Sequence, residues 1–90
     1  MKGETVIVRA FRGRPHIRRV WESTDTTVYV CSEERYQRLL VDEYEWPPTG
    51  FPREDVFHFD PNVVDKLMQE WETNPSVWEQ LEPWKGGENQ

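Results

Sequence analysis

The residues best suited to ligand chemistry lie near the N-terminus, where arginines stand among aromatic side chains. An arginine can hold a phosphate or a carboxylate through two parallel hydrogen bonds, and a flat ring offers a surface on which a nucleobase stacks. We therefore predict a basic-aromatic patch in this part of the chain. Its members are Arg9, Phe11, Arg12, Arg14, His16 and Arg18.

The charge balance bears on the ligand of this patch. The chain has 90 residues, with 11 Lys and Arg against 17 Asp and Glu, and a net charge of −6. Residues 1–20 carry +5, whereas residues 21–90 carry −11. A dedicated nucleic-acid-binding domain usually has a basic balance, so the acidic total disfavours nucleic acid. Alternatively, the arginines neutralise the chain's own carboxylates and cover the sheet with their aliphatic stems.

A second candidate site lies near the C-terminus, where tryptophans stand among glutamates. Short acidic-aromatic segments of this kind can dock into a groove of a partner protein. The predicted binding residues are Trp71, Trp78, Leu81 and Trp84. These side chains carry more apolar area than suits a flexible tail, so packing against the protein's own sheet is the alternative. The sequence leaves open a self-packed segment, a dimer interface and a partner-binding surface.

Catalysis is not predicted for this chain. Cys31, His16 and His58 could supply a nucleophile and a base, but no third group is placed to orient them. Acidic residues in exposed loops lack the apolar setting that raises the pKa of a carboxyl group. Zinc needs about four ligands, and the same three residues are the only thiol or imidazole donors. We expect no catalytic residue, no metal site and no cofactor.

The elements that must position these residues begin with a three-stranded meander. Strands are predicted over 5–11, 16–22 and 26–31, where β-branched and aromatic residues predominate. Turns are predicted at 12–15, which contains Gly and Pro, and at 23–25. If both turns are tight, the numbers of paired residues sum to 27 in the first hairpin and to 49 in the second.

This assumed register assigns each side chain to a face of the sheet, and a slip of one residue would exchange the faces. The predicted core face holds Val6, Val8, Ala10, Ile17, Trp21, Val28 and Val30, with Arg19 as its only charge. The opposite face holds Ile7, Val20, Tyr29, Arg9, Arg18, Cys31, Phe11 and His16. Arg19 then needs a carboxylate partner, for which the candidates are Glu33, Glu34 and Asp55.

Two helices are predicted from their caps and their apolar spacing. Ser32 can cap a helix over 33–41, and Asp60-Pro61 can begin a second helix that ends at Asn74-Pro75. The second helix is amphipathic, with apolar side chains at i, i+3, i+4 and i+7. These are Val64, Leu67, Met68 and Trp71. Residues 76–79 form a capping box for a further helical turn.

The segments between the helices complete the fold. Residues 42–52 contain three prolines and are predicted to form an ordered, irregular loop that buries Tyr44, Trp46 and Phe51. Residues 55–59 are predicted as a fourth strand. The order β-β-β-α-β-α indicates one α+β domain over 1–84 followed by a frayed tail at 85–90. A strongly twisted antiparallel sheet or an SH3-like barrel, with a C-terminal amphipathic helix, fits this order.

From these features we expect a small non-catalytic interaction module that binds a protein partner or forms a homodimer through exposed aromatic surfaces. One alternative is a nucleic-acid-associated protein that uses the basic hairpin. Another is an acidic regulator whose carboxylates mimic phosphate at a basic site of its partner. No apolar run is long enough for a membrane span, and the single cysteine indicates a reducing compartment, which we take to be the cytoplasm.

Overall fold

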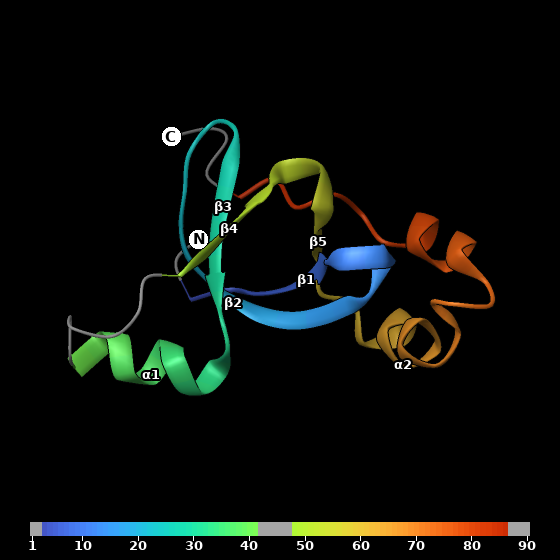
Figure 1. Cartoon of the computed structure of the whole chain (residues 1–90), viewed down its shortest axis with the longest axis horizontal. Helices are drawn as coiled ribbons and strands as arrows, with labels where there is room; N and C mark the ends of the chain where they lie inside the picture. The colour runs from blue at the N-terminus through green and yellow to red at the C-terminus, as the bar shows by residue number, and fades with distance from the viewer. Residues whose placement is uncertain (1–2, 42–47, 87–90) are drawn as a thin grey trace.

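The chain forms a small α+β domain built on a five-stranded antiparallel sheet. A computed structural model describes residues 3–41 and 48–86. The strands are β1 (Thr5–Arg9), β2 (Pro15–Ser23), β3 (Thr27–Cys31), β4 (Thr49–Pro52) and β5 (Val56–His58). The helices are α1 (Glu33–Val41) and α2 (Pro61–Glu70), with short 3-10 helices η1 (Phe11–Gly13), η2 (Arg53–Asp55) and η3 (Pro75–Gln80). Figure 1 shows α1 and α2 at opposite ends of the sheet.

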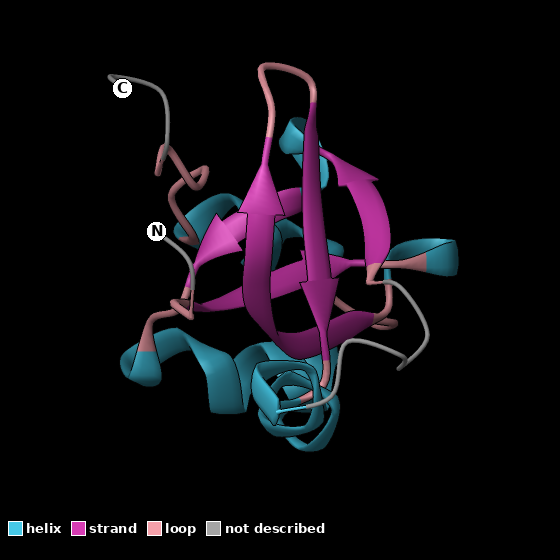
Figure 2. Ribbon diagram, turned by 90° about the vertical axis from the view of Figure 1, so that its left-hand side faces the viewer, coloured by secondary structure: helices cyan, strands magenta, loops and turns pink. Residues whose placement is uncertain are grey.

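The sheet is open, so the predicted SH3-like barrel is not confirmed. Its strand order is β4-β3-β2-β1-β5, and among the described residues no pairing joins β4 to β5. The strand directions rotate strongly from one edge to the other (Figure 2). Strand β4 lies in the segment 42–52 that we predicted to be irregular, and its pairing with β3 corrects that prediction for Thr49–Pro52. Residues 42–47, which include Tyr44 and Trp46, lie outside the described residues.

The first hairpin has a different register from the one assumed above. Thr5 pairs with Arg19 and Arg9 with Pro15, so the paired numbers sum to 24 rather than 27. The reason is the position of the turn: the amide of Ala10 donates to the carbonyl of Arg14 at 2.8 Å and η1 fills the space between them, so the turn is centred on Arg12 and not between Gly13 and Arg14. A shift of three residues is odd, and it therefore exchanges the two faces of β2.

The second hairpin is also shifted, by one residue. Arg19 pairs with Cys31 and Val20 with Val30, which gives a sum of 50, and a bulge at Trp21 changes the register again. Because both shifts are odd numbers of residues, β1 and β3 keep their predicted orientation relative to each other, and the common face predicted for them is correct. Strand β2 lies between them, and its side chains lie on the face opposite to the predicted one. Val20 therefore lies on the core face, and Ile17 and Trp21 do not.

Apolar side chains pack on both faces of the sheet. All five strands contribute to the first cluster, which fills the concave face, together with Trp84 from the C-terminal segment. Its members are Val6, Val8, Val20, Val28, Val30, Val56 and Trp84, with Phe51 packed against them. Helices α2 and η3 cover the other face through a second cluster: Ile7, Phe57, Val64, Leu67, Val77, Trp78 and Leu81. The run Val6 to Val8 is fully buried because β1 is covered on both sides.

Both predicted helices are confirmed, together with their N-terminal caps, but α2 ends at Glu70, before the predicted end at Asn74-Pro75. The hydroxyl of Ser32 accepts from the amide of Arg35 at 3.2 Å, and the carboxylate of Asp60 accepts from the amide of Asn62 at 2.9 Å. Tyr36 of α1 is buried, with its ring 5.8 Å from the ring of Trp21 in an edge-on arrangement. Among the described residues, no helix combines the length and apolar character that crossing a bilayer requires.

Candidate binding site on the concave face

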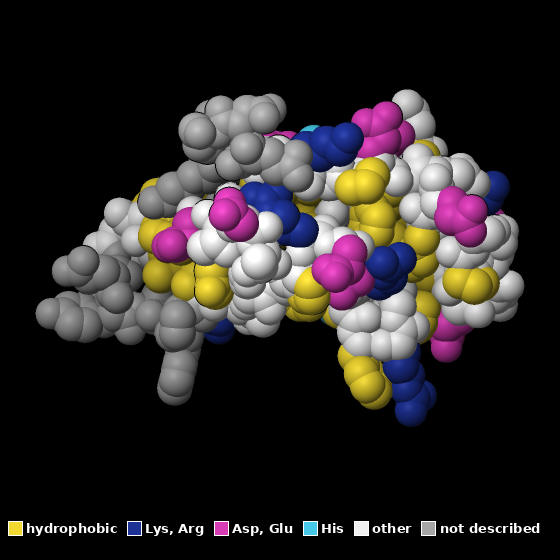
Figure 3. All heavy atoms as spheres, turned by 90° about the horizontal axis from the view of Figure 1, so that it is seen from above, with side chains coloured by type: hydrophobic (Ala, Val, Ile, Leu, Met, Phe, Trp, Pro, Cys, Tyr) yellow, Lys and Arg dark blue, Asp and Glu magenta, His cyan; other side chains and the backbone are white. Residues whose placement is uncertain are grey.

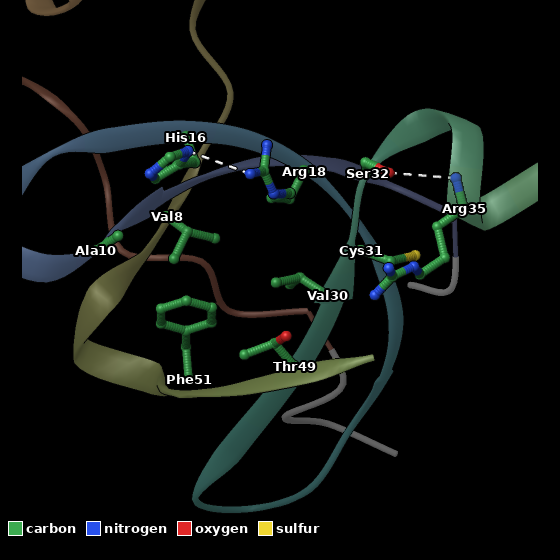
Figure 4. Close-up of a pocket in the computed structure, with 10 residues that line it drawn as sticks. All are labelled: Val8, Ala10, His16, Arg18, Val30, Cys31, Ser32, Arg35, Thr49 and Phe51. Carbon is green, nitrogen blue, oxygen red and sulfur yellow. Dashed lines mark hydrogen bonds between the residues drawn. The ribbon is translucent and has the colours of Figure 1, made fainter. Parts of the chain in front are cut away.

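A cavity of about 340 Å³ opens on the concave face of the sheet. Figure 4 shows His16 and Arg18 of β2 on one side of it and Thr49 and Phe51 of β4 on the other. The remaining lining residues come from β1, β3 and the first turn of α1: Val8, Ala10, Val30, Cys31, Ser32 and Arg35. Among the described residues no carboxylate lines it, so this cavity, which we call cavity 1, has a positive lining.

A second cavity, cavity 2, adjoins cavity 1 along β2. Its volume is about 470 Å³, and it lies between the β1–β2 turn and the end of α2. The lining comprises Ala10, Phe11, Arg12, Arg14, His16, Trp71 and Glu72. Ala10 and His16 line both cavities, so the two adjoin, and we refer to them together as the groove. It begins on the concave face and ends beside the first hairpin, where Phe11 and Trp71 line it and Trp71 also packs against the second cluster.

The chain's eight arginines divide into two groups. Four of them hold the fold together. Arg9 pairs with Asp55 at 3.1 Å, and Arg19 and Arg38 pair with Glu33 and Glu34. Arg53 donates to the carbonyls of Thr24 and Gly86. For these four arginines the contacts agree with the alternative given above, in which arginines neutralise the chain's own carboxylates.

The other four arginines are Arg12, Arg14, Arg18 and Arg35, and within residues 3–41 and 48–86 none of them has a carboxylate within ion-pair distance. These are the same four that line the two cavities. The guanidinium of Arg18 donates to the carbonyl of Ile17 at 2.8 Å and lies 3.1 Å from Nδ1 of His16. A guanidinium has five N–H donors, so each of these groups retains capacity for a ligand.

The structure brings together five of the six residues of the predicted basic-aromatic patch, and their role in binding stays a prediction. Phe11, Arg12, Arg14, His16 and Arg18 all line the groove. Arg9 does not, because the shifted register turns it toward the opposite face, 5.0 Å from the ring centre of Phe57 and 5.5 Å from that of Trp78. Sequence reasoning missed Arg35, which α1 brings over the sheet. The signal was present in the cap at Ser32, since it fixes where the first helical turn begins.

The second candidate site is corrected by burial. Trp78, Leu81 and Trp84 are 5%, 5% and 2% exposed, so they pack on the protein's own sheet and do not form a docking surface. Nε1 of Trp78 donates to the carbonyl of Gly13 at 3.1 Å, which ties η3 to the first hairpin. Trp71 is half-buried and borders cavity 2. Of the four predicted residues, it alone belongs to the groove.

The tip of the first hairpin presents an exposed ring on a strained backbone. Arg12 has φ 62° and ψ 19°, the left-handed conformation that glycine adopts most easily. Phe11 is 81% exposed, and the guanidinium of Arg12 lies 5.3 Å from its ring centre. An exposed phenylalanine beside a strained residue gains nothing for the core, which favours a role in contact with another molecule.

Replacing Arg12 with glycine should stabilise the protein. The left-handed conformation costs an ordinary residue about 1–2 kcal/mol, and the greater freedom of glycine in the unfolded chain offsets part of the gain. We expect a net gain of up to about 1 kcal/mol in the free energy of unfolding, measured by urea denaturation. Arg12→Gln, which removes the charge but keeps the strain, should leave the stability unchanged. A glycine variant less stable than the wild type would contradict this assignment.

The titratable groups of cavity 1 are held in their neutral forms. Burial lowers the pKa of His16, and the guanidiniums of Arg18 and Arg14 lower it further. Burial also raises the pKa of the Cys31 thiol, against the opposing effect of nearby arginines. A neutral thiol and a weakly basic imidazole make a poor nucleophile and a poor base. The cavity is suited to holding an anion rather than to covalent chemistry.

The expected carboxylate partner of Arg19 is also found. Arg19 pairs with Glu33, donates from Nε to the carbonyl of Gly3 at 2.6 Å, and lies 4.1 Å from the ring centre of Tyr36. Hydrogen bonds from Gln37 and Arg19 lower the pKa of Glu33. Arg19 lies on the side of α1 and not on the core face, because the shifted register moves it there.

Fold and site together define a small α+β domain with an open antiparallel sheet and a basic groove on its concave face. No protein family, curated protein or solved structure matches this chain. Among the described residues, no group of three or more His, Cys, Asp or Glu side chains could hold a metal ion. The function must therefore be argued from the groove itself.

Proposed function

We propose that this chain is a non-catalytic binding module that holds an anionic ligand in the groove on its concave face. One observation carries the proposal: the four arginines without a carboxylate partner in the described part of the chain are the four that line the groove. Unpaired guanidiniums gathered in one concave surface repel one another, and a bound anion relieves that repulsion.

The same groove supports the absence of catalysis. The thiol of Cys31 and the imidazole of His16 are neutral, as the directions of their pKa shifts require. Cys31 is a free, buried cysteine, which supports our proposal of a reducing compartment such as the cytoplasm. If the ligand is a protein partner, we propose that an acidic or phosphorylated segment of it binds in the groove. Most of the aromatic surface first expected to bind a partner is buried, because Trp78, Leu81 and Trp84 pack inside the protein.

An NMR titration with inorganic sulfate tests the proposal, since the charge of sulfate does not change near neutral pH. We expect saturable shifts of the amides of Ala10, His16 and Arg35, with a dissociation constant of about 1 mM. The lowered pKa of His16 should rise when sulfate binds, because an anion favours the imidazolium. Sulfate binding then takes up a proton, and its affinity should increase as the pH falls from 8 toward the pKa of free His16.

The charged and titratable residues that line the groove with His16, among the described residues, are Arg12, Arg14, Arg18, Arg35, Cys31 and Glu72. Histidine is the side chain whose ordinary pKa lies near neutrality, so His16→Asn should remove the pH dependence of the affinity while sulfate still binds. Shifts that do not saturate, or that are spread over Lys66 and Lys85 instead of the groove, would overturn the proposal.

A further inference from the structure

We infer that the anionic ligand is a single-stranded nucleic acid whose backbone follows β2 and whose bases stack at the aromatic end of the groove. This inference rests on the proposed function and names its ligand. Three features of the groove carry it: the spacing of its cations, the two rings beside them, and the position of its one carboxylate.

The start of β2 carries a row of side chains with the spacing that a linear polyanion requires. Arg14, which precedes β2, and His16 and Arg18 of β2 are alternate residues of extended backbone, so they lie on one face, about 6.6 Å apart. The two arginines are the cations of this row, and the neutral imidazole between them can donate a hydrogen bond. The pairings Val6–Arg18 and Val8–His16 confirm that this is the concave face. Such a row matches successive phosphates of one strand better than a single compact anion, which would occupy only one cavity. Arg35 adds a further cation across cavity 1.

The aromatic rings of cavity 2 favour bases over acidic peptide side chains. Phe11 and Trp71 line the same cavity, whose volume of about 470 Å³ is in the range of small-molecule sites. Every nucleobase has a flat face that stacks on such rings, whereas an aspartate or glutamate side chain gains little from them. An exposed Phe11 with Arg12 against its ring is the usual combination at single-strand binding surfaces.

The carboxylate of Glu72 separates the two parts of the groove. It lines cavity 2 beside Trp71, and among the described residues it is the only carboxylate in the lining of either cavity. A phosphate is repelled beside Glu72, while the amino group of a base can donate to it. Phosphates are thus directed to Arg14, Arg18 and Arg35, and bases to the rings of cavity 2.

The net charge of −6 does not decide between anionic ligands, because it repels an acidic peptide as much as a nucleic acid. On the face shown in Figure 3, acidic, basic and hydrophobic side chains are interspersed, so the carboxylates are not gathered into one patch there. Screening by salt confines their repulsion to about 8–10 Å at physiological ionic strength. Of the charged side chains among the described residues that line the groove, four are arginines and one, Glu72, is a carboxylate.

Fluorescence anisotropy with a labelled single-stranded oligouridylate tests the inference. We expect binding whose association constant falls with salt, with a slope of about −2 on a double-logarithmic plot, for three cation contacts. Phe11→Ala should weaken binding about tenfold without changing stability, since Phe11 is 81% exposed. Phe59→Ala is the matched control: Phe59 is an exposed phenylalanine that lines neither cavity, so its loss should not affect binding.

A polyglutamate peptide of equal charge and a duplex of the same length distinguish the outcomes. Tighter binding of the single strand than of either competitor, with the loss in Phe11→Ala, supports the inference. Equal binding of peptide and single strand with no effect of Phe11→Ala overturns it and leaves the proposed function standing. A duplex that binds as tightly as the single strand also overturns it, because paired bases cannot stack on the rings. If no probe binds, sulfate included, both proposals fail.

Discussion

Replacing Trp78 with alanine should destabilise the domain by about 3–5 kcal/mol, a large part of the total for a chain of this size. Trp78 is 5% exposed and packs against Phe57, with 5.1 Å between ring centres. It also ties η3 to the first hairpin through its bond to the carbonyl of Gly13. Urea denaturation followed by circular dichroism measures the loss. A change below about 1 kcal/mol would mean that Trp78 is exposed in solution, as a docking surface requires.

Two phenylalanine variants separate the hydrogen bond of Trp78 from its packing. Trp78→Phe and Trp84→Phe remove similar apolar area from buried positions. Only Trp78 donates a hydrogen bond, since Nε1 of Trp84 has no acceptor among the described residues. Trp78→Phe should therefore destabilise the fold by about 1 kcal/mol more than Trp84→Phe. Equal losses in the two variants would show that the bond to Gly13 contributes nothing.

The helices of this fold can be predicted from local sequence signals. The face of the sheet on which each β2 side chain lies cannot. The caps at Ser32 and Asp60 determine where the helices begin, and both were predicted correctly because capping depends on neighbouring residues alone. The register of a hairpin depends on the length of its turn. The assumption of a two-residue turn placed Arg18 and Arg9 together, whereas the observed turn separates them onto opposite faces.

The residues of the candidate site were also predicted only where they are close together in the sequence. The residues of the β1–β2 turn were found because basic and aromatic types are close in sequence there. Arg35 and Trp71 were not assigned to the groove, since α1 and the end of α2 bring them in from distant parts of the chain. Strand β4 was missed because Pro52 and Gly50 are rare within strands; β4 is a short edge strand, where both are tolerated.

Replacing both Arg18 and Arg35 with glutamine should weaken the binding of sulfate and of oligouridylate at least about 100-fold, because each guanidinium loses charge-assisted hydrogen bonds to the anion. The fold should not be weakened. Neither side chain has a carboxylate partner in the described residues, and removing Arg18 relieves one of the effects that, after burial, lower the pKa of His16. The pKa of His16 should rise toward its ordinary value in this variant.

Arg9→Gln, on the other face of the same sheet, should change the stability of the fold and not the binding of a ligand. Arg9 bonds the carboxylate of Asp55 and the carbonyl of Glu54, and its guanidinium covers the rings of Phe57 and Trp78. Its loss should destabilise the fold by about 2 kcal/mol and leave binding unchanged. Loss of a structural arginine thus lowers the free energy of unfolding, whereas loss of a ligand-binding arginine lowers the affinity for the anion. If the Arg18 and Arg35 variant lost stability as Arg9→Gln does, those two residues would be structural, and the groove would have no unpaired cations to offer a ligand.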